Sequence, residues 1–98
     1  MLTKEIILNY LKDHKVDFFN KYSIEEIALF GSFATEQYND ASDIDIAYKT
    51  ASRGLTYAQL LKLEDEFQEE FHKSIDLVNL EYMNPLVKRK ALKEMIYV

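Results

Sequence analysis

Residues 27–48, IALFGSFATEQYNDASDIDIAY, contain the pattern that decides the fold of this 98-residue chain. An apolar run ends at Gly31-Ser32, and ten residues later Asp43-Ile44-Asp45 opens a segment in which polar and apolar residues alternate. An apolar run stopped by glycine is typical of a buried strand, and alternation with period two is typical of a strand with one buried face. The stretch therefore predicts two strands, over Glu26–Phe30 and Asp43–Tyr48.

Helical periodicity surrounds these two strands. Working outward, the sequence predicts a helix from Thr3 to about Asp13, a short helical or irregular piece over Val16–Tyr22, a long helix over Thr56–His72, a third strand over Ser74–Leu80, and a final helix that starts near Pro85 and extends to Met95 and Ile96. The order of helix, strand, strand, helix, strand, helix predicts an α+β fold, in which a small mixed β-sheet has helices packed on one face.

Length and composition limit the classes of protein that fit. A chain of 98 residues has room for a single domain, here residues 1–98. The net charge of −5 argues against direct nucleic-acid binding, which needs an excess of Lys and Arg. Because the chain has no cysteine, disulfides and thiolate metal sites are excluded. With no apolar run long enough to span a bilayer and no signal-peptide pattern at its start, we expect a cytoplasmic protein without membrane contact.

Three aspartates occupy positions that are unusual for this residue type. Asp43 and Asp45 lie in one predicted strand and Asp76 in another, although aspartate is depleted in strands. Side chains two apart on a strand share a face, so Asp43 and Asp45 converge, and Asp76 joins them if its strand lies alongside. An all-oxygen cluster of this kind suits Mg²⁺ or Mn²⁺. In the alternative interpretation, Asp43 only caps a turn after Ser42 and Asp76 is a surface residue at the sheet edge.

The turn at Gly31-Ser32 offers a second functional signal. Glycine after a buried strand lets the backbone turn sharply and approach a ligand closely. Ser32 adds a hydroxyl and an N–H group, and a short helix from Phe33 adds further N–H groups. Backbone dipoles of this kind can hold phosphate oxygens, so Gly31 and Ser32 are candidate nucleotide-binding residues.

Gly31-Ser32, the ten residues after it and Asp43-Ile44-Asp45 together resemble the signature of nucleotidyltransferases of the polymerase-beta superfamily. Ser42-Asp43-Ile44-Asp45 and the later Asp76 are similar to the small MNT branch, the minimal nucleotidyltransferases, and the resemblance covers almost the whole chain. It implies a polymerase-beta-like nucleotidyltransferase fold. It also implies that Asp43, Asp45 and Asp76 are catalytic and bind metal, with two Mg²⁺ ions expected and Mn²⁺ as the alternative, and that Gly31 and Ser32 hold the β- and γ-phosphates.

The resemblance also implies a reaction and a partner. Small members of the family are often antitoxins paired with helical HEPN-domain toxins, and some transfer AMP from ATP to a tyrosine of the toxin. We therefore expect an Mg²⁺-dependent adenylyltransferase with a HEPN partner, and leave homo-oligomerisation open. Two alternatives remain: a nucleotide-binding module that neutralises its partner by binding alone, and a nucleotidyltransferase that modifies a small molecule such as an antibiotic.

Two positions depart from the family pattern. Many relatives have a basic residue and then a glycine where this chain has Thr35 and Glu36. A missing cation near a triphosphate removes a charge-assisted contact, and this favours the binding-module alternative. Lys49, Arg53 and Lys73 are the candidates to replace that cation.

Overall fold

The computed structural model describes all 98 residues, which form five α-helices, one 3-10 helix and four strands. In chain order the elements are α1 Lys4–Asp13, α2 Lys15–Tyr22, β1 Ile24–Phe30, α3 Gly31–Ala34, β2 Ile44–Thr50, α4 Tyr57–Phe71, β3 Ile75–Asn79, the 3-10 helix η1 Leu80–Tyr82, α5 Pro85–Leu92 and β4 Ile96–Tyr97. No helix combines the length and the apolar character that crossing a bilayer requires.

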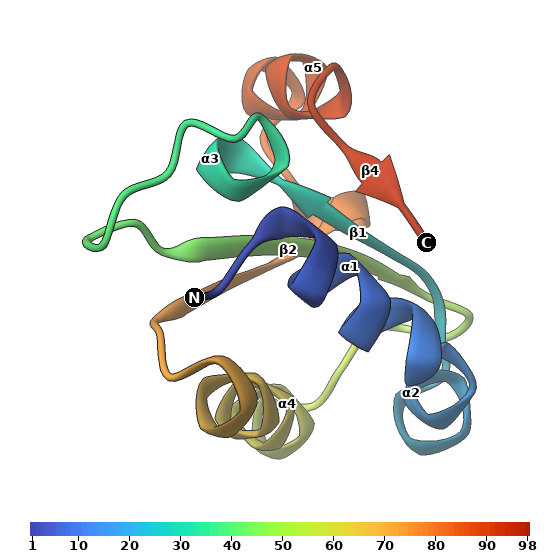
Figure 1. Cartoon of the computed structure of the whole chain (residues 1–98). Coiled ribbons are helices and arrows are strands. Elements are labelled where there is room, and N and C mark those ends of the chain that lie inside the picture. Colours follow the sequence, from blue (N-terminus) through green and yellow to red (C-terminus); the bar gives the residue numbers. More distant parts are fainter.

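The strands form one mixed sheet in the order β3-β2-β1-β4 (Figure 1). β1 pairs antiparallel with both β2 and β4, whereas β2 and β3 run parallel. The parallel pair is joined through α4, as a parallel connection requires a crossover. The predicted α+β class with a mixed sheet is confirmed.

The main helical layer covers one face of the sheet. Figure 1 shows α1, α2 and α4 together on one side of it. Alternate residues of β2, namely Ile44, Ile46 and Tyr48, point into this layer and are buried. Phe67 of α4 and Leu11 of α1 meet them there, and neither is exposed to solvent. The apolar stripes of the helices and the apolar positions of the strands thus form one core, as the periodicity predicts.

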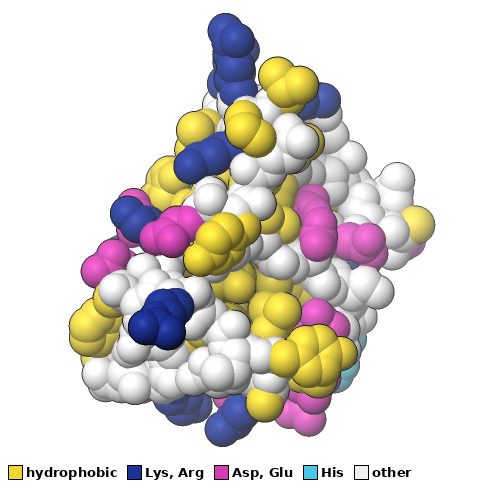
Figure 2. Space-filling view, turned by 180° about the vertical axis from the view of Figure 1, so that it is seen from behind, with side chains coloured by type: hydrophobic (Ala, Val, Ile, Leu, Met, Phe, Trp, Pro, Cys, Tyr) yellow, Lys and Arg dark blue, Asp and Glu magenta, His cyan; other side chains and the backbone are white.

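The opposite face of the sheet is covered only in part. Ala28 and Ala47 lie on this face and are fully buried, and η1 packs against β2. Helix α5 lies on this side as well, so the helices are not confined to one face (Figure 1). Where α5 lies, dark-blue basic and yellow apolar side chains mix on the surface (Figure 2), and Leu86 is 80% exposed.

Local signals set most helix starts. The Thr3 side chain accepts a hydrogen bond from the Ile6 N–H, at 3.3 Å, and caps α1. Thr56 and Gln59 form a complete capping box at the start of α4. Pro85 occupies the first turn of α5, where its missing N–H costs nothing.

The main differences from the sequence predictions lie at element ends. The final helix ends at Leu92, and Ile96–Tyr97 form the edge strand β4 instead of continuing it. Two residues are too few for a period-two pattern to show. Asp43 lies one residue ahead of β2, not within it. Val16–Tyr22, left between helical and irregular, belongs to helix α2.

Candidate active site

Asp45 and Asp76 lie side by side on neighbouring strands. The parallel register pairs Ile44 with Ile75 and Asp45 with Asp76. Because the isoleucines point into the core, the two aspartates point to the opposite face, with strands about 4.8 Å apart. The structure thus fulfils the condition on which convergence of these two carboxyl groups depends.

The electrostatics of Asp45 reflect this crowding. Burial raises the pKa of its carboxyl group from 3.8 to about 6, and the negative charges of Asp76 and Asp43, a hydrogen bond with Asp76 and the charge of Glu94 add to the effect. Like charges that meet in a partly buried place favour a shared proton or a bound cation. A group with its pKa near neutrality is also a common feature of functional sites.

Gly31 lies directly against the Asp45 carboxylate. A Cβ atom at position 31 would collide with the Asp45 Oδ2 atom, and the backbone of Gly31 has φ +74°, a conformation that favours glycine. Ser32 follows in the first turn of α3 and is half-buried. The predicted turn and the Asp45–Asp76 pair therefore meet in one place.

Asp43 stands beside this pair without joining it closely. Its side chain is exposed, and its charge contributes to the raised pKa of Asp45. The turn ahead of it is closed by other groups, because Ser42 Oγ accepts from the Asn39 N–H and Asn39 Oδ1 accepts from the Ala41 N–H. Asn39 and Ser42 thus close this turn with their own side chains.

The metal-binding expectation can be tested against this arrangement. No group of three or more His, Asp or Glu side chains is assembled in a geometry that holds a metal ion. The donor chemistry nevertheless fits a hard divalent cation, because Asp45 and Asp76 are adjacent carboxyl groups and the charge of Asp43 reaches Asp45.

Glu94 is a fourth carboxylate near the site, and the sequence analysis missed it. β4 pairs Ile96 with Leu29, and continuing this antiparallel register backwards brings Glu94 toward Gly31. The Glu94 charge also acts on Asp45. Its place follows from the β4 pairing, whereas the apolar pattern around it predicts a helix, so no sequence signal identifies it.

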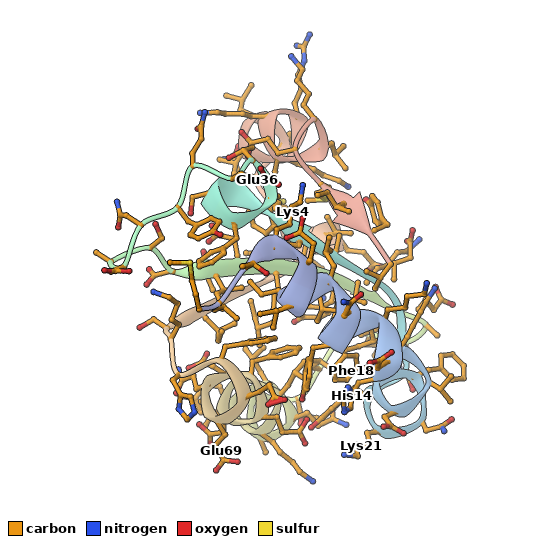
Figure 3. All side chains as sticks on the ribbon, viewed as in Figure 1. Lys4, His14, Phe18, Lys21, Glu36 and Glu69 are labelled. Carbon is orange, nitrogen blue, oxygen red and sulfur yellow. The ribbon has the colours of Figure 1, made fainter.

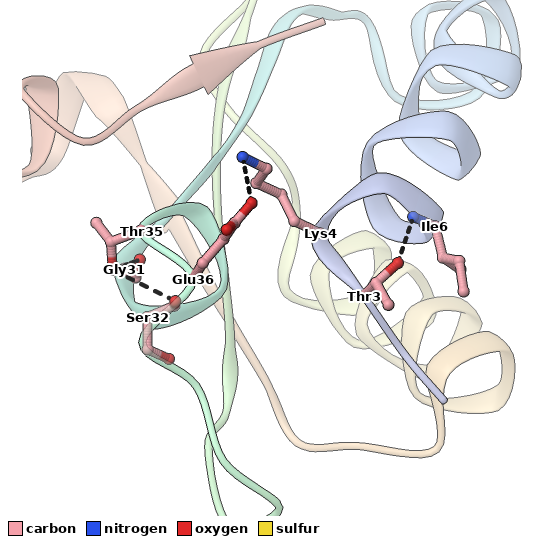
Figure 4. Close-up of polar contacts among 7 residues, drawn as sticks. All are labelled: Thr3, Lys4, Ile6, Gly31, Ser32, Thr35 and Glu36. Atoms are coloured by element: carbon pink, nitrogen blue, oxygen red, sulfur yellow. Dashed lines mark hydrogen bonds and ion pairs between the residues drawn. The ribbon is translucent and has the colours of Figure 1, made fainter.

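Thr35 and Glu36 are both engaged in local structure. The Thr35 hydroxyl group lies 3.2 Å from the Gly31 carbonyl oxygen and 3.3 Å from that of Ser32, and donates back into α3. Glu36 adopts φ +61° and forms an ion pair with Lys4 of α1, at 2.8 Å (Figures 3 and 4). Thr35 therefore stabilises α3 from within, and Glu36 connects the end of α3 to α1. Neither side chain supplies the cation that the family pattern has at these positions.

The candidate replacement cations are placed differently from one another. Lys73 Nζ donates to the carbonyl oxygens of Asp40, at 2.8 Å, and Ser42, at 3.4 Å. Lys49 lies 3.9 Å from Glu26. Arg53 lies in the segment between β2 and α4, where its carbonyl oxygen accepts from the Tyr82 hydroxyl group. Lys73 is thus the candidate that bonds to the segment directly ahead of Asp43.

Comparison with known proteins identifies relatives along the whole chain. The family described as "Polymerase beta, Nucleotidyltransferase" matches residues 7–98. A protein of Methanocaldococcus jannaschii named as a protein adenylyltransferase is 33% identical over 102 residues, which cover 100% of both chains.

Solved structures share the fold. A minimal nucleotidyltransferase superposes with a TM-score of 0.77 at 19% identity, covering 97% of this chain and 95% of that one. A toxin–antitoxin structure with AMP-PNP gives 0.73 at 24% identity, covering 98% and 72%. A tri-AMPylated Shewanella oneidensis HEPN toxin in complex with MNT antitoxin gives 0.63 at 22% identity, covering 96% and 66%. At these identities the likeness establishes the fold.

Proposed function

The chain belongs to the polymerase beta nucleotidyltransferase family, and we propose that it transfers AMP from ATP to a hydroxyl group of a partner protein, in a reaction that requires Mg²⁺. The Methanocaldococcus jannaschii relative, named as a protein adenylyltransferase, matches over its full length. Its name supports ATP as the AMP donor and a protein as the acceptor. The family match over residues 7–98 confirms the predicted family and the nucleotidyltransferase class.

The observation that carries this proposal is the Asp45–Asp76 pair beside the Gly31-Ser32 turn. Gly31 and Ser32 are proposed to hold the β- and γ-phosphates, because the absence of a Cβ at Gly31 leaves the backbone open to a close approach. A triphosphate held there has its phosphorus atoms next to the carboxylates. In nucleotidyl transfer, the protein contributes mainly by positioning the reacting groups and stabilising their charge.

Asp43, Asp45 and Asp76 are the residues proposed to hold Mg²⁺. When bound, divalent ions in such sites neutralise phosphate charge and lower the pKa of an attacking hydroxyl group. The protein's own contribution is to keep Asp45 and Asp76 in register on rigid strands, whose apolar neighbours Ile44 and Ile75 are fixed in the core. Burial, and then the charges of Asp76 and Asp43, raise the pKa of Asp45, and this supports a role in binding a cation, because a cation stabilises the ionised carboxylate.

The proposed reaction is an in-line displacement. The hydroxyl oxygen of the acceptor attacks the α-phosphorus, a new oxygen–phosphorus bond forms, and the bond to the β-phosphate breaks to release pyrophosphate. Asp76, which is exposed, is proposed to face the acceptor and receive its proton. Gly31 and Ser32 hold the departing pyrophosphate.

The acceptor is proposed to be a tyrosine of a HEPN-type partner. One structural relative is an MNT antitoxin in complex with an AMPylated HEPN toxin, and the fold is shared over 96% of this chain. This supports the antitoxin role that the resemblance implies.

A labelling experiment tests the proposal. The chain is incubated with a HEPN-type toxin, Mg²⁺ and ATP labelled at the α-phosphate, and transfer to the toxin is followed. Asp45→Asn and Asp76→Asn should lower transfer by about a thousandfold, because each removes a charge that must act on the transition state. Asp65→Asn, an exposed aspartate on α4, is the matched control and should transfer at the wild-type rate. Equal transfer by wild type and Asp45→Asn contradicts the proposal.

A second candidate is neutralisation by binding alone. It is favoured by Thr35 and Glu36, which are engaged within the fold and leave no cation there. Under this alternative, Asp45→Asn protects against the toxin as well as wild type at equal concentration. The same set of variants therefore separates the two candidates.

A further inference from the structure

Lys73 joins segments of the chain that are distant in sequence. It follows α4 and is half-buried, and its ammonium group donates to the backbone carbonyl oxygens of Asp40 and Ser42, 33 and 31 residues earlier. The same ammonium group lies 5.9 Å from the centroid of the Phe33 ring. One side chain thus contacts both the segment that leads into β2 and helix α3.

Each contacted segment bears a residue of the candidate site. Ser42 immediately precedes Asp43, Phe33 immediately follows Ser32, and Lys73 itself lies three residues before Asp76. A backbone hydrogen bond from the Ile44 N–H to the Ser74 carbonyl oxygen, at 3.0 Å, runs beside it. Lys73 is therefore placed to fix the spacing between Asp43, Ser32 and Asp76 without touching any of them.

The segment that Lys73 holds has few other restraints. Residues 39–43 are mostly exposed and lie outside any helix or strand. Their own bonds, from Asn39 to Ser42 Oγ and from Ser42 to the Asn39 carbonyl oxygen, close the turn on itself but do not attach it to the sheet. A charge-assisted bond of 2.8 Å to Asp40 supplies an attachment.

We propose that Lys73 is a positioning residue, which sets the Asp43 carboxylate relative to Asp45 and Asp76 by holding residues 40–42. The role rests on the proposed function, because it assigns Asp43 to the nucleotide site. It also gives Lys73 a task other than direct contact with the triphosphate.

Amide hydrogen exchange tests the structural half of this proposal without any reaction. Lys73→Met keeps the aliphatic stem and removes the ammonium group, so exchange over residues 39–44 should become about tenfold faster. Lys73→Arg should restore most of the protection. Lys62→Met, an exposed lysine on α4, is the matched control and should exchange as wild type does. If Lys73→Met fails to fold, Lys73→Gln replaces it.

Calorimetric titration with ATP at fixed Mg²⁺ tests the functional half. Lys73→Met should bind about tenfold more weakly and need a higher Mg²⁺ concentration, whereas Lys73→Arg should stay near wild type. Unchanged exchange over residues 39–44 overturns the proposal, and so does faster exchange with unchanged ATP affinity. If the wild-type chain itself binds no Mg²⁺–ATP, the proposed function fails, and the exchange data still show whether Lys73 holds the segment.

Discussion

Successive side chains of β2 point alternately to the two faces of the sheet, which are different environments. Ile44, Ile46 and Tyr48 enter the core beneath α1, α2 and α4, where 16 buried residues form one cluster. Asp45 points to the other face, where it meets Asp76 and Gly31. The same backbone thus supports an apolar layer on one side and mutually repelling carboxylates on the other.

The difference indicates how the site is maintained. Burial, and then repulsion from Asp76 and Asp43, disfavour the ionised Asp45 carboxylate and raise its pKa. The strands cannot separate to relieve this repulsion, because their other side chains are fixed in the core. The apolar face therefore provides the stability that the carboxylate face lowers, and substitutions on the two faces should change stability in opposite directions.

The largest effect is expected on the apolar face. Phe67 is fully buried and packs against Phe18, with ring centroids 5.5 Å apart. Phe67→Ala should lower the free energy of unfolding by about 3–5 kcal/mol, because it leaves a cavity in the core. Urea denaturation measures the change. Leu61→Ala, at a position 43% exposed on the same helix, is the control and should cost little. A loss below about 1 kcal/mol for Phe67→Ala would remove the basis of the comparison.

An intermediate effect of opposite sign is expected on the carboxylate face. The pKa of Asp45 is raised to about 6 in the folded chain from the ordinary 3.8, so the folded state binds the proton more tightly than the unfolded state. Its contribution favours folding below about pH 4 and is lost as the pH rises through 6. Asp45→Asn removes this dependence and should be more stable than wild type by about 1–2 kcal/mol at pH 7 to 8, allowing for partial solvent screening.

The pH dependence is measured as a difference between two proteins. Subtracting wild-type from Asp45→Asn unfolding free energies at each pH cancels the other titrating groups. The difference should rise between pH 4 and 6 and then level off. A flat line for Asp45→Asn would show that burial and the neighbouring charges do not disfavour the ionised Asp45 carboxylate in the folded protein.

Patterns within single segments make the main strands and helices, and part of the candidate site, predictable from sequence. The alternation around Asp45 identified β2, and the stripe through Leu63 and Phe67 identified α4. The proximity of Asp45 and Asp76 followed once the two strands were neighbours, because a period of two fixes the face.

Contacts between distant segments were not predictable in this way. Strand β4 has two residues and depends on pairing with β1, so neither it nor the approach of Glu94 has a local pattern. The bonds of Lys73 to Asp40 and Ser42 depend on where α4 ends relative to the sheet. Thr35 and Glu36 were identified only as departures from a family pattern, and their partners came from the fold.

The smallest effect concerns Glu36, which follows α3 and pairs with Lys4 of α1. Its φ of +61° is a conformation that costs a non-glycine residue about 1 kcal/mol. The side chain forms the ion pair with Lys4 that joins α3 to α1, yet it is 58% exposed and screened by water.

Two substitutions separate these contributions. Glu36→Gln removes the charge but keeps the strained backbone, whereas Glu36→Gly removes both. We therefore expect Glu36→Gly to be more stable than Glu36→Gln by about 1 kcal/mol in thermal unfolding, with wild type close to Glu36→Gly at low salt. In 1 M salt, which screens the ion pair, wild type should move toward Glu36→Gln. If wild type is instead clearly more stable than Glu36→Gly at low salt, the ion pair with Lys4 outweighs the backbone strain, and α1 then helps to support the nucleotide turn as well as the core.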